Sequence, residues 1–349
     1  MNTPRYFSSN DEGAVQCTLC PRRCLMAQGK VGVCKVRLVR NGNPALPFYG
    51  FITAMAVDPI EKKPLYHYRP GSEILSIGFA GCNLHCPFCQ NWHISQNIKI
   101  QKTDASGRIY TPAEIISAVE KTGKAASRSI AYTYSEPLVH AEFLLDCMNE
   151  AKKSGIANVL VTNGCINSEA GEEILGLCDA VNIDLKCFSK ETYENVLGGD
   201  LSAVLDFIHK AIEKGVHVEV TTLVVPDLND SEEELDACMN FIAGLKNGEE
   251  ASSGKSAVPW HLSAYHPDWK WNAPPTGNEI LERTAARARK CLEYVYTGNV
   301  AGEKNNTPCP HCGKILIKRH GYNVDTSRLL LNDGIYFCAS CGKKAPVRY

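Results

Sequence analysis

Three cysteines in the middle of the chain have the spacing of an iron–sulfur cluster site. They are Cys82, Cys86 and Cys89, and they lie in the stretch GFAGCNLHCPFCQNW at residues 78–92 as a Cys-x3-Cys-x2-Cys pattern. Thiolates are soft ligands that select iron–sulfur clusters, and one short loop can present three of them to a cubane. The sequence offers no fourth cysteine nearby. The pattern therefore predicts a [4Fe-4S] cluster in which one iron is left free for chemistry.

Zinc is the alternative occupant of this loop. A closed zinc site takes four ligands, and His85 and His93 are the nearest histidines that could supply the fourth. The chain would then be a non-catalytic zinc-binding scaffold or interaction protein. The loop follows a predicted strand, which is where parallel α/β proteins place their active sites, and this position favours the cluster and an enzyme.

Four cysteines near the C-terminus form two Cys-x2-Cys pairs, Cys309 with Cys312 and Cys338 with Cys341. Each pair is followed by glycine, and 25 residues separate the two pairs. Four thiolates in this arrangement predict a closed tetrahedral zinc site of the zinc-ribbon type. Such a site leaves no open position for chemistry, so we expect a structural role, with docking of a partner or substrate as the alternative. An auxiliary iron–sulfur cluster is the competing occupant.

A third group lies near the N-terminus: Cys17, Cys20 and Cys24, followed by Cys34 after a GKVGVC turn. These four thiols can also ligate a metal, but their spacing fits no familiar zinc pattern closely. The group is therefore expected to hold either a structural zinc, which we favour, or a second iron–sulfur cluster.

The elements between residues 74 and 300 alternate short β-rich runs with helical patterns, which is typical of βαβ units and a parallel sheet. Capping signals at Thr111–Glu114 and at Ser231 with Glu234 mark helix starts, and Gly248 marks a stop. The fold class is thus α/β, with a complete or partial (β/α) barrel of parallel strands. We expect seven strands: Ile74–Ala80, Ser129–Tyr134, Asn158–Thr162, Ala180–Leu185, His217–Val225, Trp260–Tyr265 and Glu293–Tyr296.

The segments on either side of the barrel are rich in cysteines and turn residues. We therefore predict three parts: an N-terminal four-cysteine metal-binding module at residues 1–45, the barrel at 46–300, and a zinc-ribbon-like module at 301–349. The polar stretch at residues 247–256 is expected to be a surface loop without chemistry.

Charge and composition narrow the partners and the compartment. The 349 residues include 37 Lys and Arg against 38 Asp and Glu, so nucleic acid is not indicated as a partner. The N-terminal stretch has no apolar signal core, and no apolar run is long enough for a membrane span. An odd count of 17 cysteines in such a chain argues for metal ligation rather than disulfides. We expect a soluble cytoplasmic protein.

The cysteine loop, with the aromatic Phe88 directly before its last cysteine, resembles the radical S-adenosylmethionine (SAM) superfamily. Further motifs, together with the C-terminal cysteine pairs, resemble the radical SAM enzyme of the AmmeMemoRadiSam system over nearly the whole chain. They are DPIEKKPLYHYRPGS at 58–72, CPFCQNW, YTYSEP, VTNG, NIDLK and PWHLSAYHP. Pyruvate formate-lyase activating enzymes are related. The resemblance implies an oxidoreductase whose cluster reduces SAM to a 5′-deoxyadenosyl radical, which abstracts hydrogen from an unidentified substrate.

The resemblance also implies a cofactor site at the ends of the strands. A Gly-Gly-Glu-type motif normally follows the second strand, and Tyr134-Ser135-Glu136 stands there without its glycines. Motifs at the next two strand ends match activating-enzyme relatives, and a histidine after the sixth strand lies near the ribose in them. The implied cofactor-binding residues are Phe88, Tyr134, Ser135, Glu136, Thr162, Asn163, Asp184, Lys186 and His266.

Strand ends predict an overlapping set from the residues alone, because a parallel barrel gathers its active site there. Polar residues in this position are Asn163, Asp184, Lys186, Thr222, His261 and His266. For His261, Thr221 and Asn182 a structural role is an equal expectation. Asp184 and Lys186 could pair with each other.

The implied partners follow from the same resemblance. Flavodoxin or ferredoxin is expected to donate the electron. The substrate is either a glycyl residue of a partner protein, as in activating-enzyme relatives, or a small molecule or macromolecule presented by a Memo-type protein. The motifs do not distinguish these substrates.

Overall fold

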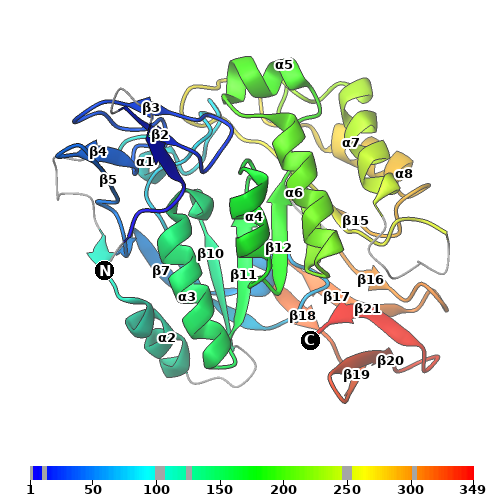
Figure 1. Ribbon diagram of the computed structural model, residues 1–349. Coiled ribbons are helices and arrows are strands. Elements are labelled where there is room, and N and C mark those ends of the chain that lie inside the picture. The colour runs from blue at the N-terminus through cyan, green and yellow to red at the C-terminus, as the bar shows by residue number, and fades with distance from the viewer. Residues whose placement is uncertain (1–2, 10–13, 99–106, 123–127, 246–253, 301–304) are drawn as a thin grey trace.

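A single mixed sheet forms the centre of the protein. The computed structural model describes residues 3–9, 14–98, 107–122, 128–245, 254–300 and 305–349. Eight strands pair in the order β15-β14-β13-β12-β11-β10-β8-β7, so each crossover leads to the neighbouring strand (Figure 1). The strands are β7 (Ala54–Pro59), β8 (Glu73–Gly78), β10 (Ser129–Thr133), β11 (Ala157–Thr162), β12 (Ala180–Asp184), β13 (His217–Val224), β14 (Trp260–Ala264) and β15 (Val295–Gly298).

Seven of these strands are parallel, and they are the seven that the sequence predicted. The eighth, β7, runs antiparallel to β8 and was not predicted. The sheet ends at β7 and β15, which are not paired with each other in the described part of the chain, so the barrel is partial. The α/β fold class and its parallel partial barrel are therefore confirmed.

Helices cover the outer face of the sheet (Figure 1). Each buries one apolar stripe: α6, for example, buries Val204, Phe207, Ile208 and Ala211, at helical spacing. The helices are α1 (Trp92–Ser95), α2 (Pro112–Lys121), α3 (Ala141–Lys153), α4 (Ser168–Leu175), α5 (Lys190–Thr192), α6 (Leu201–Glu213), α7 (Glu232–Gly244) and α8 (Asn278–Ala288), with single turns η1 (Ile60–Lys62), η3 (Pro137–His140) and η4 (Tyr193–Leu197).

One of the two predicted capping boxes is complete. At α2 the Thr111 hydroxyl accepts from the Glu114 N–H, and the Glu114 carboxylate accepts from the Thr111 N–H. At α7 Ser231 caps as predicted, but the Glu234 carboxylate accepts from the backbone N–H groups of residues 188 and 189, which follow β12. This glutamate therefore ties a helix start to a strand end. The predicted stop at Gly248 lies outside the described residues, as does most of the 247–256 loop.

The N-terminal segment packs its small strands against the barrel. It contains a sheet of β1 (Phe7–Ser9), β2 (Val15–Cys17) and β3 (Leu25–Met26) and the hairpin of β4 (Leu38–Arg40) and β5 (Asn43–Ala45), while β6 (Phe51–Ile52) pairs with β9 (Arg108–Ile109). Arg37 is buried and reaches both carboxylate oxygens of Glu142 in α3, at 2.6 and 2.9 Å. A bidentate pair of this kind fixes the segment to the barrel.

The C-terminal segment folds into two small antiparallel sheets with an apolar core of their own, which includes Leu316, Ile317 and Val347. The strands are β16 (Thr307–Pro308), β17 (Ile315–His320), β18 (Asn323–Asp325), β19 (Leu329–Asn332), β20 (Ile335–Cys338) and β21 (Lys344–Arg348). In Figure 1 these strands lie at the lower right, away from the N-terminal strands at the upper left.

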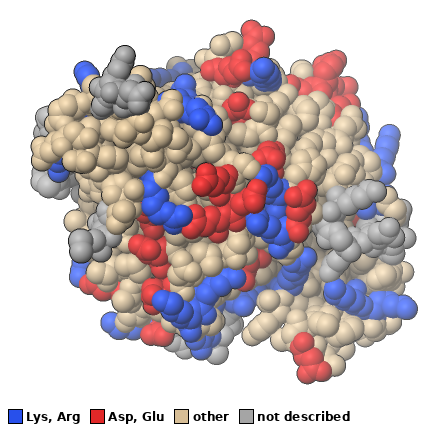
Figure 2. All heavy atoms as spheres, viewed as in Figure 1, with Lys and Arg blue, Asp and Glu red and all other residues tan. Residues whose placement is uncertain are grey.

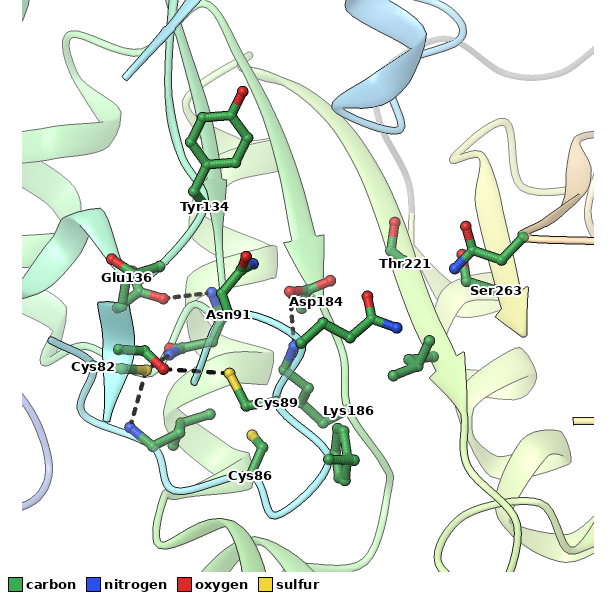
Figure 3. Close-up of a pocket in the computed structure, with 18 residues that line it drawn as sticks. Cys82, Cys86, Cys89, Asn91, Tyr134, Glu136, Asp184, Lys186, Thr221 and Ser263 are labelled. Carbon is green, nitrogen blue, oxygen red and sulfur yellow. Dashed lines mark hydrogen bonds and ion pairs between the residues drawn. The ribbon is translucent and has the colours of Figure 1, made fainter. Parts of the chain in front are cut away.

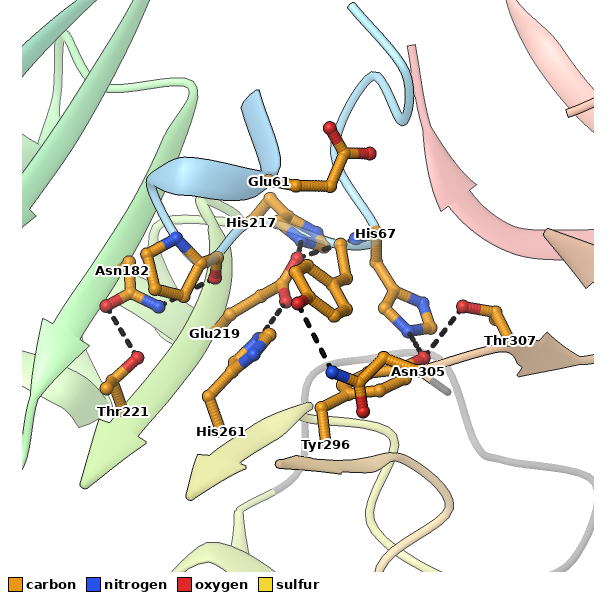
Figure 4. Close-up of polar contacts among 12 residues, drawn as sticks. Glu61, His67, Asn182, His217, Glu219, Thr221, His261, Tyr296, Asn305 and Thr307 are labelled. Atoms are coloured by element: carbon orange, nitrogen blue, oxygen red, sulfur yellow. Dashed lines mark hydrogen bonds and ion pairs between the residues drawn. The ribbon is translucent and has the colours of Figure 1, made fainter. Parts of the chain in front are cut away.

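A buried polar network joins the C-terminal segment to the barrel (Figure 4). Glu219 in β13 accepts from the His67 backbone N–H at 2.7 Å and from Nε2 of His217 and His261 at 3.0 and 2.6 Å. The His67 ring donates through Nδ1 to the Pro346 carbonyl at 2.6 Å, because a carbonyl can only accept. Burial opposes ionisation of Glu219, but the two histidines hold its pKa well below the usual range. His261 is therefore part of this structural network.

Charges of both signs are interspersed over the face seen in Figure 2. This mixture agrees with the formal net charge of −1. Among the described residues, no helix is both long and apolar enough to cross a bilayer.

Candidate active site

A cavity of about 240 Å³ opens where the parallel strands end and the cysteine loop begins (Figure 3). The three cysteines enter it from the loop after β8, while β10, β11 and β12 contribute polar side chains from their ends. The lining residues are Cys82, Leu84, Cys86, Phe88, Cys89, Gln90, Asn91, Ser95, Tyr134, Ser135, Glu136, Asn163, Asp184, Lys186, Thr221, Leu223, Ser263 and Asn299. Most of the sequence-predicted cofactor residues therefore meet in one place.

The cysteine loop is held by hydrogen bonds to its sulfurs. The Leu84 N–H and the Asn163 side-chain amide donate to Cys82 Sγ at 3.4 and 3.7 Å. Cys89 Sγ lies 3.3 Å from Ser95 Oγ in α1. Burial raises the pKa of the Cys86 thiol to about 12. A bound metal would therefore have to displace thiol protons.

The spacing of the three sulfurs differs from that of a single-ion site. Within the described ranges, only the four C-terminal cysteines form a group of three or more ligand atoms that all lie within 4.8 Å of one another. At least one pair among Cys82, Cys86 and Cys89 is therefore wider, and neither His85 nor His93 completes a compact group. A tetrahedral zinc with Zn–S bonds of about 2.3 Å places its sulfurs about 3.8 Å apart. The loop fits a cubane better than a zinc ion.

Glu136 joins the ends of the second and third parallel strands. Its carboxylate accepts from the Thr162 hydroxyl at 2.6 Å, from the Asn163 N–H at 2.9 Å and from the Leu138 N–H at 3.0 Å. Burial nevertheless raises its pKa to about 7. Thr162 does not line the cavity itself and contacts it through Glu136, which does.

Asp184 and Lys186 form an ion pair on the cavity wall, as the sequence suggested they could. Lys186 Nζ donates to Asp184 Oδ2 at 2.7 Å. Burial works to lower the pKa of Lys186, but the neighbouring Asp184 and Cys86 outweigh it and raise the pKa above its usual value. The lysine therefore stays charged, and the cavity offers one positive and one negative group side by side.

Tyr134 stands where the Gly-Gly-Glu-type motif has a glycine, and it takes the backbone conformation that glycine would favour. Its φ is +69°, in the left-handed region that costs a non-glycine residue energy. The side chain is fixed by a hydrogen bond from its hydroxyl to Asp58 Oδ2 and by Lys63 Nζ, which lies 4.5 Å from the ring centroid. Ser135 donates its hydroxyl to the Phe79 carbonyl at 2.8 Å. Contacts of the tyrosine ring thus hold a backbone that glycine would adopt freely.

Other predicted residues lie outside the cavity. His266 is exposed, and its Nε2 lies 2.9 Å from Nε2 of Gln90, which lines the cavity. Thr222 is buried in the core, where its hydroxyl accepts from Trp260 Nε1 at 3.0 Å, so it does not reach the site. His266 therefore stands outside the cavity lining and contacts it through Gln90.

For Thr221 and Asn182 the sequence left a structural role and a site role equally open, and the two residues differ in the structure. Thr221 lines the cavity and donates to Asn182 Oδ1 at 2.9 Å. Asn182 instead donates to the Pro64 carbonyl at 2.8 Å and does not line the cavity. Figure 4 shows Asn182 beside Thr221. The lining also includes residues to which no role was assigned from the sequence: Leu84, Gln90, Asn91, Ser95, Leu223, Ser263 and Asn299. Leu84, Gln90, Asn91 and Ser263 lie inside the sequence motifs quoted above, and the position of Asn299 just after a strand end could have indicated it.

The four C-terminal cysteines form a compact group that could hold a metal ion. Cys309 Sγ lies 3.8 Å from Cys341 Sγ, and Cys312 Sγ lies 3.8 Å from Cys338 Sγ. These separations equal the spacing of about 3.8 Å that tetrahedral Zn–S bonds imply.

Comparison with known proteins gives the family. The radical SAM superfamily matches residues 76–241, from β8 through the cysteine loop to α7. An uncharacterized protein of Methanocaldococcus jannaschii is 37% identical over 350 residues, which is 99% of each chain. The pyruvate formate-lyase-activating enzyme of Clostridium pasteurianum is 29% identical over 62% of this chain and 87% of its own length. Among solved structures, a radical SAM methyltransferase from Sphaerobacter thermophilus has a TM-score of 0.48 and 13% identity, covering 70% of this chain and 71% of its own. The protein, an enzyme by this kinship, belongs to the radical SAM superfamily.

Proposed function

We propose that this protein cleaves SAM reductively and uses the resulting 5′-deoxyadenosyl radical to abstract hydrogen from a substrate at the cavity mouth. The observation that supports this most is the loop of three thiols, spaced too widely for one ion, opening into a cavity with a charged pair. Cys82, Cys86 and Cys89 would ligate a [4Fe-4S] cluster with one iron free of protein ligands. When bound, that cluster supplies the electron that cleaves SAM.

The cavity walls suit the charges of the cofactor. SAM carries an amino group, a carboxylate and a sulfonium, and Asp184 and Lys186 present one charge of each sign. We assign cofactor binding to the wall residues Phe88, Tyr134, Ser135, Glu136, Asn163, Asp184 and Lys186, with Thr162 and His266 as positioning residues. The Glu136 hydrogen bonds fix the backbone of two strand ends, which keeps their polar groups oriented before the cofactor arrives.

A glycyl residue of a partner protein is the substrate that we favour. The activating enzyme of Clostridium pasteurianum supports it, since the similarity covers 87% of that enzyme. The resemblance to the AmmeMemoRadiSam system offers the second candidate, a small molecule or macromolecule presented by a Memo-type protein. Flavodoxin or ferredoxin is the proposed electron donor.

The chemistry is tested by 5′-deoxyadenosine formation. Anaerobically reconstituted protein given SAM and dithionite should produce it. Cys86→Ala should abolish the product, whereas Cys291→Ala, which changes a thiol away from the cavity, should not. Unchanged formation of 5′-deoxyadenosine by Cys86→Ala would contradict the proposal.

The substrate class needs a separate measurement. Candidate partner proteins carrying α-deuterated glycine are incubated with the active enzyme and SAM. Deuterium in 5′-deoxyadenosine supports glycyl activation. Transfer from a labelled small molecule, and none from any glycine, would exclude it and favour the second candidate.

We also propose zinc as the metal of the four C-terminal cysteines. Metal analysis should then find zinc that Cys312→Ser removes, while the iron of the barrel stays. The three-part division at residues 1–45, 46–300 and 301–349 remains our proposal for the domains. The cytoplasm remains the proposed compartment, and it agrees with 17 cysteines that are all free of disulfides.

A further inference from the structure

The four N-terminal cysteines meet in one place, although 17 residue positions separate the first from the last. Cys17, Cys20, Cys24 and Cys34 line one small cavity together. Three apolar side chains share this lining, and they are Leu19, Val33 and Val139. Converging thiols in an apolar pocket are the usual surroundings of a buried metal centre.

The spacing of these sulfurs argues against a single ion. Any three of the four include a pair more than 4.8 Å apart, since the C-terminal cysteines alone meet that limit in the described part of the chain. The same structure therefore holds one group of four cysteines at single-ion spacing and another at wider spacing. The wider group resembles the Cys82 loop in this respect, and that loop is the proposed cubane site.

The surroundings of the sulfurs fit an iron–sulfur centre in other ways. The Val33 N–H donates to Cys24 Sγ at 3.4 Å, and such bonds to sulfur tune cluster potentials. Arg22 and Arg37 also line the cavity, where a centre ligated by four thiolates would carry negative charge. Arg37 is paired with Glu142, so Arg22 is the cation whose charge is the more available.

The N-terminal cysteines are in direct contact with the loop that carries Cys82, Cys86 and Cys89. The space beside the Gly81 Cα, just before Cys82, is taken by the Cys34 carbonyl oxygen. Asn83 lines the N-terminal cavity, and its Oδ1 accepts a hydrogen bond from the Asn163 side-chain amide at 2.9 Å. The nitrogen of that same amide lies 3.7 Å from Cys82 Sγ. Gly81 and Asn83 therefore connect the N-terminal cavity with the loop that carries Cys82.

We propose that Cys17, Cys20, Cys24 and Cys34 ligate a second iron–sulfur cluster. It would pack against the loop that carries Cys82, Cys86 and Cys89, the proposed site of the first cluster. Four protein thiolates leave no iron open, so this cluster does not bind SAM. This proposal takes the second of the two occupants that the sequence left open at these cysteines, in place of the zinc favoured from their sequence. It does not depend on the activity proposed above.

The test removes the first site and analyses the remaining metal. Full-length protein with Cys82→Ala, Cys86→Ala and Cys89→Ala is reconstituted anaerobically with iron and sulfide. We expect about two to four iron atoms per chain with matching sulfide, and a reduced-state EPR signal that SAM does not alter. Adding Cys20→Ala and Cys24→Ala should remove that iron, whereas adding Cys147→Ala, a buried thiol of α3, should leave it.

Zinc without sulfide at the N-terminal cysteines of the triple variant overturns the proposal, even if the wild-type protein cleaves SAM. Should the triple variant fail to fold, the wild-type protein decides the matter. Iron that persists in Cys20→Ala/Cys24→Ala at the full wild-type amount, together with loss of one zinc, refutes the second cluster.

Discussion

The carbonyl oxygen of Cys34 lies in the space that a Cβ atom on Gly81 would occupy. Real side chains do not tolerate so close an approach, so the contact requires glycine. Gly81 also has a φ of +79°, which glycine adopts without steric cost. The N-terminal cysteine module and the loop that begins with Cys82 are thus matched surfaces.

Gly81→Ala should therefore damage the cysteine loop. We expect a loss of about 1–3 kcal/mol from overpacking, in addition to about 1–2 kcal/mol for the left-handed backbone. Iron bound at Cys82, Cys86 and Cys89 and the yield of 5′-deoxyadenosine should fall together. Gly42→Ala is the control, because Gly42 has a φ of +73° with nothing within 4 Å of the added atom. Equal behaviour of the two variants would show that the contact does not matter.

Lys186→Met should weaken SAM binding. The substitution removes the cation of the cavity wall and leaves Asp184 without its partner 2.7 Å away. Losing a hydrogen bond to a charged group costs about 1.5–3 kcal/mol, which corresponds to roughly 10- to 100-fold weaker binding. Equilibrium binding of SAM to the reconstituted protein measures this directly. Lys190→Met is the control, since Lys190 is exposed and pairs with Glu194 at 3.6 Å, away from the cavity. Similar affinity in Lys186→Met would remove this lysine from the site.

Glu136 should make stability depend on pH. Burial raises its pKa from about 4.5 to about 7, so the folded protein binds a proton in this window that the unfolded chain releases. The contribution is therefore present at acid pH and is lost as pH rises from about 4.5 to about 7, by about 3 kcal/mol. Denaturant midpoints at pH 5 and pH 8, measured anaerobically, should fall more for the wild type than for Glu136→Gln. Parallel pH dependences in the two proteins would contradict the shifted pKa.

The sequence predicted those features that depend on local pattern. The seven parallel strands are buried on both faces and so read as apolar runs, and the Cys82 loop is contiguous. The strand β7 was not predicted because its burial is mixed, with Ala56 and Val57 exposed. Asn299 lines the cavity just after a strand end but belongs to no quoted motif, and Ser263 lies in one without having been assigned a role.

Other features depend on contacts far apart in the chain. His67 and Glu219 are separated by 152 positions, so no local pattern could assign this histidine or His261 to a buried network. The N-terminal cysteines show the same limit, since their order along the chain left zinc and iron–sulfur open. The separation of their sulfurs in space is the observation behind our proposal of an iron–sulfur cluster.

Glu219→Gln should destabilise the protein without changing its chemistry. The carboxylate accepts three hydrogen bonds in full burial, and an amide in its place would direct an N–H at one of those donors. Breaking a buried charged network of this kind costs about 3–5 kcal/mol. The His67 ring also contacts the Pro346 carbonyl, so part of the loss should loosen the C-terminal segment from the barrel. Denaturant unfolding should show the lower stability, and hydrogen exchange should show faster exchange in β21.

The surviving folded protein should bind SAM as the wild type does, because the network lies outside the cavity. Glu233→Gln, on the exposed face of α7, is the control and should leave both measurements unchanged. Wild-type stability in Glu219→Gln would mean that the network contributes little, whereas weakened SAM binding at full stability would link it to the cavity.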